Sequence, residues 1–141
     1  MELTHPLSDG MVENWELFEK IMDYIFQKNF RTDPEYHPML FSEPPWNVKA
    51  KREKLAEIMF EKYKIPALFL CKTAVLSAFA NGRATGLVVD SGATQTVCTP
   101  VYDGYALAQS VVRTPLAGDF VTAQCRLYFE EQGVELSLIH I

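Results

Sequence analysis

Residues 86–100, GLVVDSGATQTVCTP, are the segment from which the fold of this chain is best inferred. A short apolar run (87–89) ends on the carboxylate Asp90, turns through Ser91 and Gly92, and returns through an alternating segment of β-branched residues. Such runs, bounded by glycine and serine, predict a β-hairpin. An acid at the end of a buried strand suits a phosphate and its Mg²⁺, because turn N–H groups can face an anion and the carboxylate can hold the metal through water. From these residues alone, a structural hairpin in which Asp90 only caps the turn stays open as the commoner alternative.

Composition and length indicate one globular domain. The chain has 141 residues, 48% of them hydrophobic and 22% charged, which is enough to build a core. A formal net charge of -5 gives no electrostatic footprint for nucleic acid or for an acidic membrane surface. No apolar run is long enough to cross a bilayer, and no signal peptide is visible. Cys71, Cys98 and Cys125 are far apart, which favours free buried thiols in a reducing compartment, and the histidines do not cluster into a zinc site.

The rest of the chain predicts helices that alternate with strands. Expected helices cover 15–29, 48–63, 74–80 and 120–132, and expected strands cover 37–42, 65–71 and 110–113. Asn14, Asn47 and Thr73 are the expected helix caps, and Gly82 and Gly133 the expected helix ends. The first helix is expected to be well buried, and the apolar run 65–71 to be covered on both faces. This order implies an α/β domain with a mixed sheet and flanking helices, in which ligands bind at the carboxyl ends of strands. Asp90 lies at such an end.

Basic residues crowd the first half of the expected helix 48–63. A charge run of this kind is usually a solvated helix face, although a functional basic patch is the alternative. It lies near the positive end of the helix dipole, which is mildly unfavourable. We therefore expect Glu43 or Glu53 to offset it by pairing with Arg52 or Lys49.

Several segments resemble the actin superfamily, in the same order and over residues 3–135. They are HPMLFSEPPWNVKAKREKLAEIMFEKYKIPALFL (37–70), AVLSAFANGRATGLVVDSGATQTVCTPVYDGYAL (74–107) and PLAGDF (115–120). The resemblance is nearest to the actin-related subunit of SWI/SNF (BAF)-type chromatin remodelling complexes. Trp46 in SEPPWN, the sequence AKREKL, and SGAT in the hairpin turn favour that branch. The same branch also resembles the actin-related subunit shared by INO-type remodellers and NuA4/TIP60-type histone acetyltransferase complexes.

The resemblance implies part of an actin-like ATPase domain, of ribonuclease H-like fold, which supplies part of one wall of an ATP-binding cleft. By position, residues 90–94 match the second phosphate loop of the family: Asp90, Ser91, Gly92, Ala93 and Thr94. Asp90 would hold the metal through water, and Gly92 would let the backbone approach the phosphates.

The departures from the family pattern concern hydrolysis. Ala93 and Thr94 stand where actin has Asp and Gly, Thr73 where actin has the Gln that positions the attacking water, and Val97 where actin has a nearby His. A threonine side chain is too short to orient that water. The resemblance therefore implies nucleotide binding in the full-length protein, without fast hydrolysis and with no catalytic residue in this chain.

The resemblance also implies that the chain is a fragment. The family's first phosphate loop would precede residue 1, and its adenosine-contacting half would follow Gly133. ATP with Mg²⁺ is therefore expected as a ligand of the full-length protein, and is expected to bind poorly or not at all to this chain. The partial actin-like domain is expected over residues 1–135, and residues 136–141 as an atypical tail.

Three functions compete. The favoured one is a non-catalytic subunit of nuclear chromatin-remodelling or histone acetyltransferase complexes, with the cytoplasm as a further location. It would pair with actin and with a helical segment of a remodelling ATPase, use ATP as a structural ligand, and contact neither a membrane nor specific nucleic acid sequences. The alternatives are an actin-fold ATPase, a sugar kinase or a cytoskeletal actin-like protein, and a non-functional truncated fragment whose apolar strands lack partners and aggregate.

Overall fold

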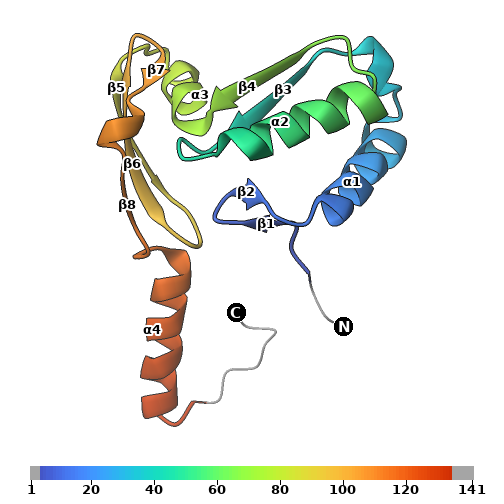
Figure 1. The fold of residues 1–141 in the computed structure, drawn as a ribbon. Coiled ribbons are helices and arrows are strands. Elements are labelled where there is room, and N and C mark those ends of the chain that lie inside the picture. The colour runs from blue at the N-terminus through green and yellow to red at the C-terminus, as the bar shows by residue number, and fades with distance from the viewer. Residues whose placement is uncertain (1–3, 135–141) are drawn as a thin grey trace. The chain divides into compact units, whose positions relative to one another are not determined.

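The computed structural model describes residues 4–134, which form two compact units (Figure 1). The first unit extends to Leu76, and the second begins at Ser77. The boundary falls inside a helix, so each unit is described by itself.

The first unit begins with a small hairpin. Its strands are β1 (Leu7–Ser8) and β2 (Met11–Val12), which pair antiparallel. The connecting Asp9 and Gly10 both have positive φ angles (53° and 73°), as a tight hairpin turn of two residues requires. The indole N–H of Trp46 donates to the Asp9 carbonyl (3.0 Å), which holds the turn against the loop that contains Trp46.

Two helical segments and a parallel pair of strands make up the rest of this unit. Helix α1 (Trp15–Tyr24) continues as a π-helical segment (Ile25–Phe30), and α2 (Lys49–Glu57) continues as another (Ile58–Lys62). A 3₁₀ turn (Pro34–Tyr36) leads into β3 (Met39–Glu43), which pairs in parallel with β4 (Leu68–Lys72). Helix α3 (Thr73–Ala80) follows β4 without an intervening loop.

The core of the first unit lies where α1 and α2, with their π-helical continuations, meet the parallel strands. Its buried members are Met22, Phe26, Leu55, Ile58, Met59, Tyr63 and Ile65. Met59 is completely buried. By the usual relation between buried apolar area and free energy, each such side chain contributes about 1.5–3 kcal/mol.

A polar network at the edge of this core joins the two helical segments. The Tyr63 hydroxyl donates to Asp23 Oδ1 (2.7 Å) and approaches the Glu19 carbonyl (3.1 Å), and Lys62 Nζ donates to the carboxylates of Glu19 and Asp23 (3.0 and 3.1 Å). Burial, and then the bond to Asp23, raise the pKa of Tyr63 from 10.0 to about 12. Burial acts to lower the pKa of Lys62, but the bonds to Glu19 and Asp23 outweigh it and raise that pKa above its usual value.

The second unit is built on an antiparallel sheet. Strand β5 (Gly86–Ser91) pairs with β6 (Thr96–Tyr102), which also pairs with β7 (Tyr105–Ala106) and β8 (Val112–Thr114). A 3₁₀ turn (Ala108–Ser110) joins β7 to β8, and α4 (Gly118–Glu131) ends at Gly133, whose φ is 72°. The α/β class is therefore confirmed, with flanking helices and with both parallel and antiparallel pairing, but the strands of residues 4–134 divide among three separate sheets.

Most predicted elements are confirmed in type, including the hairpin at 86–100 and the Asn14 cap, which accepts from the Leu17 N–H (3.0 Å). The prediction for Asn47 is wrong: Val48 occupies the cap position, and the Asn47 amide donates to Glu43 Oε2 instead (2.8 Å). The 110–113 strand is displaced to 112–114, because a 3₁₀ turn takes up Ser110.

Three burial predictions are also wrong. The run 65–71 is not covered on both faces, because its pair of strands leaves Phe69 61% exposed. Helix α1 is only partly buried, with Ile21 and Tyr24 exposed. The cysteines are free as predicted, but none is buried, because Cys71 and Cys98 are partly exposed and Cys125 is exposed. Thr73 is the first residue of α3 rather than its cap. The predicted tail, 136–141, lies outside the described residues.

In the part of the chain that the structure describes, the helices are too short or too polar to cross a membrane.

Candidate functional site

Asp90 and Ser91 close strand β5, and a four-residue turn, Gly92 to Gln95, connects them to β6. Ser91 pairs with Thr96 in the last position of the ladder, and the Gly92 N–H donates to the Gln95 carbonyl (3.0 Å). Asp90 is exposed, and no ion pair holds its carboxylate within residues 4–134. The hairpin thus places Asp90 where β5 ends, as the sequence predicted. The expectation that this strand is buried is wrong, because Leu87 and Val89 are 65% and 60% exposed.

The N-terminus of α4 anchors this turn. The Gly118 N–H donates to the Gly92 carbonyl (3.0 Å), and the Asp119 N–H donates to the Ala93 carbonyl (2.8 Å). A Cβ at Gly118 would lie 3.2 Å from the Gly92 oxygen and 3.3 Å from the Ala93 Cα. A side chain at 118 would therefore crowd the backbone of the turn, and one of the two backbones would have to shift.

This anchoring fixes the direction of two turn amides. In a planar trans peptide the C=O and N–H groups point in opposite directions. The carbonyls of Gly92 and Ala93 point at α4, so the N–H groups of Ala93 and Thr94, which complete the same peptide units, point away from it. Neither N–H donates to a backbone carbonyl of the described residues. Two consecutive amides that face one way are a typical anion-binding arrangement.

The residues at the turn therefore fit a phosphate with its metal. The amides of Ala93 and Thr94 supply donors, and Asp90 supplies a carboxylate for a hydrated Mg²⁺. Nothing in the chain itself requires glycine at 92, because an added Cβ would meet only the Gln95 oxygen, at an ordinary 3.8 Å. The missing side chain leaves room at the turn for a ligand.

A cavity of about 530 Å³ lies beside the acid. It separates the end of α3 from strand β5, and Ser77, Asn81, Arg83 and Asp90 contribute its polar lining. Its volume is in the range of small-molecule sites. That any of these groups binds nucleotide stays a prediction.

The comparisons with known proteins settle the family. The profile of the family described as Actin matches residues 1–139. The chain belongs to the actin family. It is 48% identical over 136 residues to Actin-related protein 4 of Arabidopsis thaliana, and 49% identical over 134 residues to Actin-related protein 4 of Oryza sativa, in both the indica and japonica subspecies.

These alignments cover nearly all of this chain but a minor part of its relatives. They include 95–96% of the chain and only 30–31% of each relative. The chain is thus similar to a segment of an actin-related protein, and the activity and partners of a whole family member are not described by this segment alone.

The structure also places the residues that were expected to differ from actin. Ala93 and Thr94 lie in the anchored turn, where the carbonyls of Gly92 and Ala93 accept from α4. Val97 pairs with Asp90 across the hairpin and is buried, so it is a packing residue. Thr73 begins α3 in the first unit. That none of these side chains orients a water molecule for attack stays a prediction.

A second polar cluster, at the carboxyl ends of the parallel strands, was not predicted as a whole. Glu43 and Lys72 are register partners at the ends of β3 and β4, and their side chains are 2.8 Å apart. Arg52 Nε lies 3.1 Å from the other Glu43 oxygen, which also accepts from the Asn47 amide. The expected pairs Glu43–Arg52 and Glu53–Lys49 (3.5 Å) are both confirmed. The signal for Lys72 was available, since both apolar strands end on residues of opposite charge.

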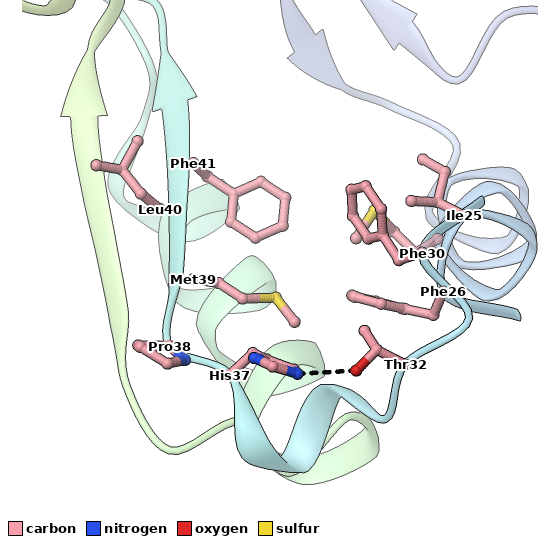
Figure 2. A pocket seen from close by; sticks show the side chains of 10 residues that line it. Ile25, Phe26, Phe30, Thr32, His37, Pro38, Met39, Leu40 and Phe41 are labelled. Atoms are coloured by element: carbon pink, nitrogen blue, oxygen red, sulfur yellow. Dashed lines mark hydrogen bonds between the residues drawn. The ribbon is translucent and has the colours of Figure 1, made fainter.

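An apolar pocket of about 550 Å³ lies between the π-helical continuation of α1 and strand β3 (Figure 2). Figure 2 shows Phe26 and Phe30 facing Met39 and Phe41 across it. Its polar feature is the 2.8 Å hydrogen bond between the Thr32 hydroxyl and the His37 ring. Among the described residues, no carboxylate lines it, so it is a weaker candidate for a phosphate and its metal than the turn after Asp90.

Proposed function

We propose that the polypeptide containing this chain is a non-catalytic actin-related subunit that binds Mg-ATP as a structural ligand. Its role would be protein–protein assembly in nuclear chromatin-remodelling or histone acetyltransferase complexes. The observation that carries the nucleotide part is the turn after Asp90, whose carbonyls are held by α4 and whose Ala93 and Thr94 amides face outward.

Binding and hydrolysis place different demands on this site. Phosphate binding needs backbone donors and a metal-holding acid, and the turn has both. Hydrolysis also needs a side chain that positions the attacking water. Thr73, Ala93 and Val97 do not supply one, and this favours a bound, slowly hydrolysed nucleotide over turnover.

ATP binding and ATP hydrolysis test the enzymatic alternative. The sample is the full-length polypeptide, which contains this chain and is as long as its relatives. We expect tight Mg-ATP binding with negligible release of phosphate. Asp90→Asn should weaken Mg-ATP binding, because the amide cannot replace a carboxylate beside a hydrated cation. Asp103→Asn is the matched control, since Asp103 lies in the turn after β6 with a φ of 46°, which asparagine tolerates. Rapid ATP hydrolysis that is abolished by Asp90→Asn would contradict the proposal that the protein is non-catalytic.

The assembly role is tested by co-purification. We expect the full-length polypeptide, isolated from nuclear extract, to carry actin and a remodelling ATPase with it. The supporting argument is the resemblance of SEPPWN, AKREKL and SGAT to the chromatin-associated branch of the family. Recovery from cytoplasm alone, without either partner, would contradict the proposal.

This chain alone is expected to lack a complete nucleotide site, because it covers 30–31% of its relatives. A ligand that binds only the native state raises the melting temperature. We therefore expect no shift on adding Mg-ATP to the chain, and a clear upward shift for the full-length polypeptide. A clear shift in the chain alone would show that this segment holds enough of the site to bind ATP.

A further inference from the structure

We draw no further inference here: the strongest candidate, the apolar pocket between the π-helical continuation of α1 and strand β3, belongs to a chain that spans 30–31% of its relatives, and nothing in the structure shows what covers it.

Discussion

Glu43 is a buried carboxylate that holds together the groups at the carboxyl ends of the parallel strands β3 and β4. Its side chain is 5% exposed, and it contacts groups from three segments: Lys72 at the end of β4, Arg52 on α2, and Asn47 in the intervening loop. Glu43→Gln keeps the shape of the side chain but removes its charge and one acceptor. It therefore tests the electrostatic contribution with little change in packing.

The cost follows from the donors that surround this carboxylate. Lys72 faces one oxygen, and Arg52 and Asn47 face the other, so the new amide group must point at a donor in either orientation. Breaking a buried ion pair usually costs about 3–5 kcal/mol. Lys72 and Arg52 are 26% and 46% exposed and can regain water, so we expect about 2–3 kcal/mol.

Urea unfolding followed by tryptophan fluorescence measures this cost. The chain has two tryptophans, Trp15 and Trp46, and both lie in the first unit, so the signal reports the unit that contains Glu43. Glu53→Gln is the matched control, because Glu53 is 65% exposed and 3.5 Å from Lys49. It should change stability by less than about 0.5 kcal/mol. Equal effects of the two substitutions would refute the argument from burial.

The remaining predictions concern the core, the polar network and the anchored turn. Met59→Ala should cost about 2–5 kcal/mol in the same urea assay, because Met59 is fully buried. Tyr63→Phe should cost about 1–2 kcal/mol through loss of the bond to Asp23. Because the folded-state pKa of Tyr63 is raised from 10.0 to about 12, this contribution is complete below pH 10 and lost as the pH rises toward 12. Alkaline unfolding curves of wild type and Tyr63→Phe should therefore converge over that range, and parallel curves would contradict the assignment. Gly118→Ala should lower the melting temperature and weaken Mg-ATP binding by the full-length polypeptide, whereas Gly86→Ala, whose added Cβ meets nothing within 4 Å, should do neither.

Local sequence patterns correctly predicted most helices and strands. The wrong predictions concern residues whose surroundings are set by contacts with distant parts of the chain. The hairpin at 86–100 was predictable because strand propensity and turn chemistry agree there. Asn47 has the side chain of a helix cap, but its amide is drawn to Glu43, four residues earlier, because that buried carboxylate needs donors. Phe69 was expected to be covered because its run is continuously apolar, yet coverage depends on which other strands join the sheet.

In the candidate site, too, local sequence signals identified some residues, while others depend on long-range contacts. Asp90 and Gly92 were identified from sequence because an acid followed by a small-residue turn is a local signal. Gly118 was not, since its contact with the turn depends on α4 returning to the hairpin. No periodicity or spacing within residues 86–100 indicates that contact.

The proposed function assigns different roles to the backbone and to the side chains of the anchored turn. The outward amides belong to the backbone, and their direction is set by carbonyls bonded to Gly118 and Asp119. Substituting the side chain at 93 or 94 leaves these bonds in place. The orientation of an attacking water depends instead on a side chain of sufficient length, which Thr73 lacks. Under the proposed function, phosphate binding would depend on backbone groups and hydrolysis on a side chain, so a sequence could lose hydrolysis and retain binding.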